Sequence, residues 1–520
     1  MASSMISTLT SNVPLLSGVA VFLALLLSII VPGWWSKRSL SKIPLWGEEL
    51  PAKTRRDALL KDSKSIYFKS YLKFKHSLGF RVSTTEDSGE KLVVSPKYLP
   101  ELIKLPPSVL SFEEAHKESF EQKYTNSPPP KFFDLTPHII KADLGPALSR
   151  LNPSMTAKAN AAVLGEIGDF GAGWTPVKIY PRMLRIIAIV SGSVFIGPEL
   201  CHDERYIDAA VNYTAELGQA VMEIKSVNFW LKRFLAGRLG SVTALRRREE
   251  DFLKFITPIV QQRIDARSTK GAGELPEDML TWLVNKAARD GINGTKEIAL
   301  IQLGLFFVAS HTTGITLTNI FYDLAAHPEC IAPLREEIRA VQDECENGIL
   351  SHAGLQRLKR LDSFMKESLR MQPLTFATFE RRVLRGFTLS DGTYIPPGTI
   401  LEIPNHAISR DPEVFEDPET FKPWRFAAEI RDGGSGAGAE KDARQQFVSV
   451  SQTLGSFGYG RHACPGRFFA ALELKMILAR AILTYDMRLE DGGGRPRNLE
   501  FGLTSAPDPE GVVMFKRVNT

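Results

Sequence analysis

Hydrophobic positions recur with a helical period through much of the chain, and only a few short stretches are β-like. The β-like stretches come early, at residues 80–83 and 91–94, and a hairpin is predicted at 387–395, where Asp391 and Gly392 supply the tight turn. Segments of helical period fill the middle of the chain, at residues 136–151, 180–195, 208–227 and 245–267. The pattern predicts a mainly α-helical fold with small β-sheets.

One apolar segment, residues 298–322, carries no Asp, Glu, Lys or Arg. A membrane span is one interpretation, but eight polar residues interrupt it: Gln302, Ser310, His311, Thr312, Thr313, Thr316, Thr318 and Asn319. Hydrocarbon tolerates such a set badly. The segment is therefore predicted to be a long central helix of a soluble domain, with its polar cluster facing a cavity, and Pro328 follows its end.

The amino-terminal 36 residues carry no charged side chain, and residues 13–32 are apolar over a length that spans a bilayer core of about 30 Å. Two tryptophans and three basic residues follow: Trp34, Trp35, Lys37, Arg38 and Lys42. A cleaved signal peptide is the alternative, but the start lacks a positive charge and no small-x-small cleavage site follows the apolar run. We predict a single-pass membrane anchor at residues 1–36, a hinge and linker at 37–66, and one large catalytic domain at 67–520.

Composition narrows the class of protein further. Hydrophobic residues make up 43% of the 520 and charged residues 24%, which excludes wholesale disorder and fibrous repeats. A net charge of +5 is too small for a chain of 520 residues to indicate nucleic acid as a partner. Four cysteines without CxxC pairing indicate a reducing compartment, in which a cysteine with a task acts singly.

The stretch around Cys464 combines the features of a reactive site. It reads Phe-Gly-Tyr-Gly-Arg-His-Ala-Cys-Pro-Gly over residues 457–466, and a helical pattern begins directly afterwards. Its glycines permit close approach of a flat ligand, and basic neighbours and a helix N-terminus favour a thiolate. A nucleophile and an axial metal ligand both fit these features, whereas an inert buried thiol does not require them.

This stretch resembles the haem-binding signature of the cytochrome P450 superfamily, Phe-x-x-Gly-x-Arg-x-Cys-x-Gly, with His462 at the arginine position. The resemblance implies a cytochrome P450 fold with haem b as cofactor and Cys464 as the thiolate ligand of its iron. It also implies that the cofactor is lined by Phe457, Gly460, Arg461, His462 and Gly466, with Arg461 or His462 pairing a haem propionate. On the N-terminal side, His138 and Lys141 are our substitutes for the propionate partners that the family often has there, with solvated surface residues as the alternative.

Two further motifs extend the resemblance. Glu367 and Arg370 lie three apart on a predicted helix; alone they could be a surface ion pair, but the family closes this Glu-x-x-Arg with a downstream arginine, here Arg425, to form a buried triad that holds the cysteine loop. On the neutral helix, the resemblance places Thr312 at the oxygen-activating position and His311 at that of the usual acid. The alternative is that these side chains only bond their own helix.

The resemblance implies a membrane-bound monooxygenase that uses O₂ and a lipophilic small molecule, with electrons from the NADPH-dependent cytochrome P450 reductase. The substrate pocket is expected to include Phe307, Ala309, Leu374, Phe376, Ala377, Phe379, Leu503 and Thr504. Basic residues near the cysteine loop, Arg461, Arg467 and Lys475, are the expected docking patch for the reductase.

The chain looks most like filamentous-fungal enzymes that tailor secondary metabolites of terpenoid, indole-diterpene or polyketide type, in the endoplasmic reticulum membrane with the catalytic domain in the cytoplasm. Two alternatives remain: a haem-thiolate isomerase or dehydratase that works without reductase, and a non-catalytic membrane protein that binds haem.

Overall fold

The computed structural model describes residues 39–168, 173–270, 275–292, 294–427 and 445–518, and most of them are helical. The predicted anchor, residues 1–36, lies outside the described residues. The longer helices are α2 (Ala52–Phe74), α7 (Gly145–Ile167), α8 (Ile179–Phe195), α9 (Glu204–Ser226), α11 (Gly240–Lys270), α12 (Met279–Arg289), α13 (Thr295–Ala326), α14 (Ile331–Asp343), α16 (Lys359–Met371) and α19 (Arg467–Thr484). The shorter ones are α3 (Leu99–Leu102), α4 (Phe112–Ser119), α5 (Gln122–Thr125), α6 (Phe132–Ile139), α10 (Phe229–Leu235), α15 (His352–Arg357) and α17 (Asn405–Ser409).

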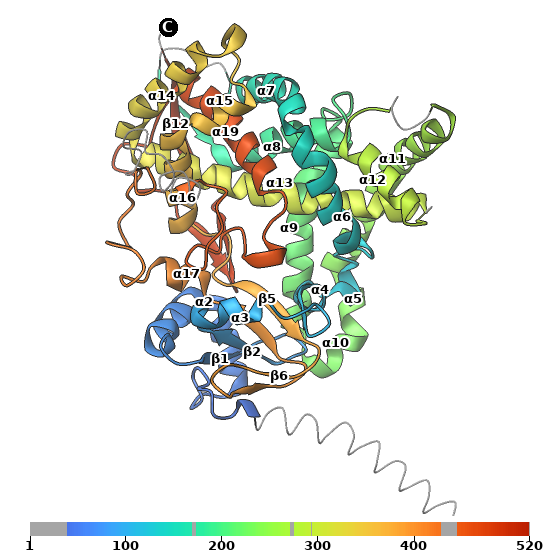
Figure 1. Cartoon of the computed structure of the whole chain (residues 1–520), viewed down its shortest axis with the longest axis vertical. Coiled ribbons are helices and arrows are strands. Elements are labelled where there is room, and N and C mark those ends of the chain that lie inside the picture. Colours follow the sequence, from blue (N-terminus) through green and yellow to red (C-terminus); the bar gives the residue numbers. More distant parts are fainter. Residues whose placement is uncertain (1–38, 169–172, 271–274, 293, 428–444, 519–520) are drawn as a thin grey trace, which may run out of the picture.

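Helix α13 is the centre of the helical part, where Figure 1 shows it crossing between α8, α9 and α16. It has the length and apolarity of a membrane span, the one such helix in the described part of the chain, yet 67% of its most apolar stretch is buried inside the protein. Neighbouring helices cover it, so charged residues would be buried without partners, which explains the neutral sequence. The prediction of a central helix at residues 298–322 is confirmed.

A five-stranded sheet forms the second part of the molecule, in the strand order β1-β2-β8-β5-β3. Strands β2 and β8 pair in parallel, and the other pairs are antiparallel. Its strands are β1 (Gly79–Ser83), β2 (Glu90–Val94), β3 (Leu110–Ser111), β5 (Thr378–Val383) and β8 (Ile400–Ile403). A hydrophobic core separate from that of the helices fills this part, and α2 and α17 pack there.

Three small sheets complete the fold. The first has the order β4-β12-β9, and the other two are the hairpins β10-β11 and β6-β7. Their strands are β4 (Thr175–Lys178), β6 (Phe387–Thr388), β7 (Tyr394–Ile395), β9 (Tyr485–Arg488), β10 (Asn498–Phe501), β11 (Thr504–Pro507) and β12 (Val512–Arg517). The predicted hairpin at 387–395 is β6-β7, and its turn residue Gly392 has the positive φ, +85°, that such a turn requires.

Part of the segment expected as hinge and linker packs with the domain. Trp46 donates its backbone N–H to Arg81 of β1, and α2 begins at Ala52 and continues past residue 66. Leu59 and Tyr67, on either side of the expected boundary, are both buried in the core beside the five-stranded sheet.

Candidate active site

Cys464 lies in a tight loop that leads into α19. The backbone N–H of Cys464 donates to the carbonyl of Phe457 at 2.8 Å, so the loop closes on itself. Gly460, with φ +73°, crosses close to another segment, since a Cβ there would lie 3.1 Å from Cγ2 of Ile103. The close approach and the left-handed backbone explain why glycine occupies this position.

The surroundings of the Cys464 sulfur favour a bound cation. Burial raises the pKa of the thiol, while the backbone N–H groups of Gly466 and Arg467 and the charge of Arg467 act in the opposite direction. The guanidinium of Arg467 is fixed by a 2.8 Å bond to the carbonyl of Cys464. A half-buried thiol that receives backbone N–H groups at a helix N-terminus is a suitable thiolate ligand for a soft metal centre.

Glu367 holds the two predicted arginines at once. Arg370 makes two bonds of 2.8 Å to its carboxylate, and Nε of Arg425 lies 3.0 Å from both carboxylate oxygens. The side chains of Glu367 and Arg370 are fully buried, so the surface-pair interpretation is excluded for this pair. The backbone N–H of Lys422 completes the set at 2.9 Å. The remaining guanidinium donors bond to backbone carbonyls of residues 409–420, which ties α16 to that segment.

A second group of charges lies around His462, and it consists of cations. The His462 ring stacks on the Phe112 ring with centroids 5.3 Å apart. The Arg381 guanidinium lies 4.9 Å from the centroid of the Phe112 ring. Arg381 is 5% exposed and has no ion pair within the described part of the chain. The nearest carboxylate, Glu380, is bound instead by Lys91 at 2.5 Å.

The pKa values reflect this excess of positive charge. Burial lowers the pKa of Arg381 to about 10. Burial also lowers the pKa of His462 to about 4, with further contributions from Arg381, Arg461, Lys141 and His116. Arg381 is a buried cation without an anion, which is costly, so this group is suited to receive an anionic ligand. A small pocket lies there, lined by Leu102, Ile103, Leu105, Leu110, Phe379, Arg381, Tyr459, Arg461 and His462.

Comparison with known proteins identifies the fold. The family model described as Cytochrome P450 matches residues 167–514. The chain belongs to the cytochrome P450 family. The chain is 34% identical to cytochrome P450 monooxygenase ATR3 of Stachybotrys chlorohalonatus, over 82% of this chain and 89% of that protein. Monooxygenase paxP of Penicillium paxilli is 32% identical, over 87% and 85%, and ccsG of Aspergillus clavatus is 31% identical, over 93% and 96%.

Membership in the cytochrome P450 family makes the protein an oxidoreductase with a haem-thiolate cofactor, and the residues present fit that group. Haem needs a thiolate for its iron and cations for its two carboxylates. Cys464 in the loop would fit the first requirement, and the cations around His462 would fit the second.

Sequence reasoning missed part of this cation group and found another part. Lys141 lies near enough to lower the pKa of His462, whereas His138 is exposed on α6. Arg381 and His116 were not predicted. The only local signal for Arg381 is its place in an alternating strand, 81 residues before His462 along the chain, and that spacing gives no indication of contact.

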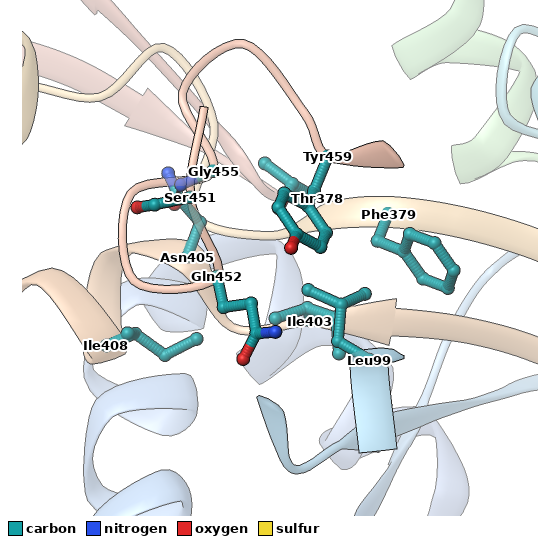
Figure 2. A pocket seen from close by; sticks show the side chains of 10 residues that line it. All are labelled: Leu99, Thr378, Phe379, Ile403, Asn405, Ile408, Ser451, Gln452, Gly455 and Tyr459. Carbon is teal, nitrogen blue, oxygen red and sulfur yellow. Dashed lines mark hydrogen bonds between the residues drawn. The ribbon is translucent and has the colours of Figure 1, made fainter. Parts of the chain in front are cut away.

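A second small cavity adjoins the segment that leads to Cys464. Figure 2 shows its lining side chains, which come from α3, β5, β8, α17 and residues 451–459. Asn405 fixes this segment, because its side-chain oxygen accepts the backbone N–H of Gly455 at 2.9 Å. The two cavities share Phe379 and Tyr459.

On α13, the two predicted catalytic residues have different contacts. Thr312 is exposed, as is Val308 one turn before it, and its hydroxyl donates to the Val308 carbonyl at 2.8 Å. This is the contact of a helical threonine with its own backbone, which was the alternative considered above. His311 lies 3.2 Å from the hydroxyl of Tyr180 on α8, and burial lowers its pKa to about 4.

The expected pocket residues divide between the two cores. Phe307, Ala309 and Leu374 pack on the helical core. Ala377 and Phe379 are buried in the core beside the five-stranded sheet, and Leu503 packs against it. Phe376 is buried against His406, and Thr504 is exposed in β11.

The expected reductase patch needs one correction. Lys475 is buried, with its amine 2.6 Å from Asp362 and 2.9 Å from the carbonyl of Leu355, so it is not available to a partner protein. Its position in the buried turns of α19 explains the difference. Arg461 is exposed and Arg467 is half-buried.

Proposed function

We propose that this cytochrome P450 monooxygenase inserts one oxygen atom of O₂ into a bulky lipophilic secondary metabolite of terpenoid, indole-diterpene or polyketide type. Its electrons come from the NADPH-dependent cytochrome P450 reductase. The observation that carries the proposal is the juxtaposition of the Cys464 loop with the buried, unpaired cation Arg381. Haem, when bound, supplies the activation of O₂.

The side chains of this protein bind and orient the haem and the substrate. When haem is bound, Cys464 would hold its iron, and Arg381, Arg461, His462 and Lys141 would pair with its carboxylates. The buried network of Glu367 holds the segment that precedes the cysteine loop and takes no part in chemistry. Thr312, on the exposed face of α13, donates its hydroxyl proton to the Val308 carbonyl, and its Oγ is left to accept a hydrogen bond from a water that carries a proton toward the reacting site.

The apolar residues expected at the substrate pocket form a wall, called here the substrate wall, that suits a lipophilic substrate. Phe307 lies edge-on to Phe120 at 5.6 Å and to Tyr213 at 6.3 Å, and Leu374 packs on Tyr180. These groups provide shape and few charges, which suits a bulky, neutral molecule.

The test is turnover of the purified full-length chain with O₂, NADPH and reductase, followed by identification of the product from candidate scaffolds. Product that requires reductase supports the proposal. Rearrangement of a pre-oxidised substrate without reductase indicates an isomerase or dehydratase, and no turnover indicates a haem-binding protein.

The ligand assignment has its own test. We expect Cys464→Ser to abolish the thiolate-type spectrum of the reduced, CO-bound protein, and Cys345→Ser, the other half-buried cysteine, to retain it. A normal spectrum in Cys464→Ser contradicts the assignment.

We further propose that residues 1–36 anchor the protein in the endoplasmic reticulum membrane with the catalytic domain in the cytoplasm, and that α10 touches the same membrane. On α10, Leu231, Phe234 and Leu235 are 51%, 63% and 43% exposed. Lys232 of the same helix is 5% exposed and lies 2.5 Å from Glu121. A water-facing helix has the reverse arrangement, so this one supports contact with lipid.

The position of α10 agrees with the anchor. The chain near Trp46 bonds to β1, and Glu86, in the turn after β1, lies 2.8 Å from Lys225 of α9. Figure 1 shows α10, β1 and β2 at the same end of the long axis.

We expect deletion of residues 1–36 to retain haem binding and to leave a weaker membrane association. Leu231→Ser with Phe234→Ser in the truncated protein should remove that remainder, because it removes the exposed apolar surface. Ile349→Ser, which removes another exposed apolar side chain that is 46% accessible, is the control in vesicle flotation. Equal flotation of truncated and intact protein contradicts the anchor, and an unchanged remainder in the double variant contradicts the role of α10.

A further inference from the structure

Tyr180 and His311 form an isolated polar contact between α8 and α13. The Tyr180 hydroxyl lies 3.2 Å from Nε2 of His311, and the rings meet edge-on with centroids 6.3 Å apart. Leu184 and Ile315 form an apolar cluster with Tyr180, and Leu374 packs on it. Since Leu374 belongs to the proposed substrate wall, the pair lies at the edge of that wall.

Which residue donates this hydrogen bond follows from the polar groups that each assignment leaves without a partner. If His311 donated from Nε2, the hydroxyl proton of Tyr180 and the bare Nδ1 of His311 would both lack partners among the described residues. If Tyr180 donates, only one group, the proton on Nδ1, lacks a partner. The second arrangement therefore costs less.

The titration of both groups agrees with this direction. Burial raises the pKa of Tyr180, so the hydroxyl retains its proton. Burial lowers the pKa of His311 to about 4, so the ring is neutral at pH 7 and carries one proton. With Nε2 accepting from Tyr180, that proton is on Nδ1.

Nδ1 of His311 is buried and has no hydrogen-bond partner within the described residues. A buried donor without an acceptor destabilises the folded protein. Because no acceptor among the described residues reaches Nδ1, the acceptor comes from a bound molecule.

We propose that Tyr180 is a positioning residue that fixes His311 as a neutral donor through Nδ1–H, directed to an oxygen atom of the bound substrate or of one ordered water molecule. The identification of a substrate oxygen as the acceptor rests on the proposed function, whereas the assignment of the His311 tautomer does not. It assigns to His311 a fixed hydrogen bond instead of the proton relay expected from sequence, because a relay requires the ring to gain a proton where Tyr180 holds Nε2.

The tautomer is measurable by ¹⁵N NMR of histidine-labelled protein in its diamagnetic, CO-bound reduced form, with His311→Gln to assign the signal. We expect the wild-type ring to be neutral with its proton on Nδ1 at pH 7. Tyr180→Phe should shift the ring toward the Nε2–H form. Tyr206→Phe is the matched control, since Tyr206 is an equally buried tyrosine that donates to the Ala188 carbonyl.

A second measurement separates the two sources of the acceptor. The probes are abietadiene and abietadienol, which share a carbon skeleton and differ by one hydroxyl, with binding followed by the optical spin shift of the ferric protein. A preference for the alcohol of about 2–10-fold, lost in His311→Phe, assigns the acceptor to the substrate. Equal binding of the two probes assigns it to water once the Nδ1–H tautomer is observed.

Two results overturn the proposal: a wild-type ring with its proton on Nε2 or on both nitrogens at pH 7, or an unchanged tautomer in Tyr180→Phe. Neither result affects the proposed function, whose failure appears instead as loss of reductase-dependent product with a normal His311 signal.

Discussion

Two groups of charged side chains lie in this protein, and they differ in balance. Around Glu367, one carboxylate holds Arg370 and Arg425, and the other guanidinium donors bond to backbone carbonyls. Around His462, the charged groups are cations, and the nearest carboxylate, Glu380, is already bound by Lys91. The first group is complete within the chain, and the second is not.

The difference shows how a fold separates support from binding. Buried charges are tolerated when each has a partner, and they destabilise the protein when one partner is missing. A balanced group therefore stabilises the folded chain by itself, whereas an unbalanced group is stabilised only by a ligand of opposite charge. A buried, unpaired charge thus indicates a ligand site.

The largest effect is expected from breaking the balanced group. Glu367→Gln leaves the guanidinium of Arg370 buried without a carboxylate and should cost about 3–5 kcal/mol of unfolding free energy. We expect little folded, haem-bound protein on expression, measured by the CO spectrum and by thermal unfolding. Glu419→Gln is the control, since Glu419 pairs with Arg410 but is 68% exposed. A stable Glu367→Gln protein would falsify the supporting role.

An intermediate effect is expected from the unbalanced group. Arg381→Gln removes a buried cation without an ion-pair partner, so the haem-free chain should unfold at the same or a higher urea concentration. Haem loses a charged hydrogen bond of about 1.5–3 kcal/mol, so its transfer to apomyoglobin should be about 10–100-fold faster. Arg382→Gln, the adjacent arginine that pairs with Glu118, is the control. Unchanged haem transfer in Arg381→Gln contradicts its role.

The smallest effect concerns pH. Because the folded pKa of His462 is lowered to about 4, the unfolded chain takes up a proton that the folded chain does not. The stability of the haem-free protein should therefore fall as the pH decreases from about 6.5 toward 4.

Haem carboxylates would favour protonated His462, so the stability of the haem-bound protein should fall less steeply as the pH decreases. Urea unfolding at several pH values measures both slopes. His462→Gln should reduce the difference between them without removing it, because His116 also has a lowered pKa. Identical slopes with and without haem contradict an anionic ligand at this group.

The helices and strands followed from local pattern because each repeats a signal over many residues. Residues 180–195 and 298–322 are helical, and the strands at 80–83 and 91–94 are present as expected. Cys464 and the set Glu367, Arg370 and Arg425 were expected from short motifs that resemble those of the cytochrome P450 family, and the structure brings the last three together.

Arg381 and Tyr180 could not be found this way, because their roles depend on contacts across the fold. Tyr180 reads as one more residue of an amphipathic helix, and it meets His311 only through the packing of α8 on α13. Arg381 resembles its neighbour Arg382 in sequence, and only burial distinguishes the two side chains. Contacts of this kind carry no local signal.

The parallel pairing of β2 with β8 has a consequence for synthesis of the protein. Lys91 pairs with Ile400 and Leu92 with Leu401, so the two strands are about 300 residues apart in the chain. At a translation rate of roughly 5–20 residues per second, the β1-β2 hairpin waits about 15–60 s for its central partner. During that interval, the Leu92 and Val93 edge of the nascent chain is open to pairing with other chains. The ribosome therefore produces β2 long before β8, the strand that pairs with its open edge.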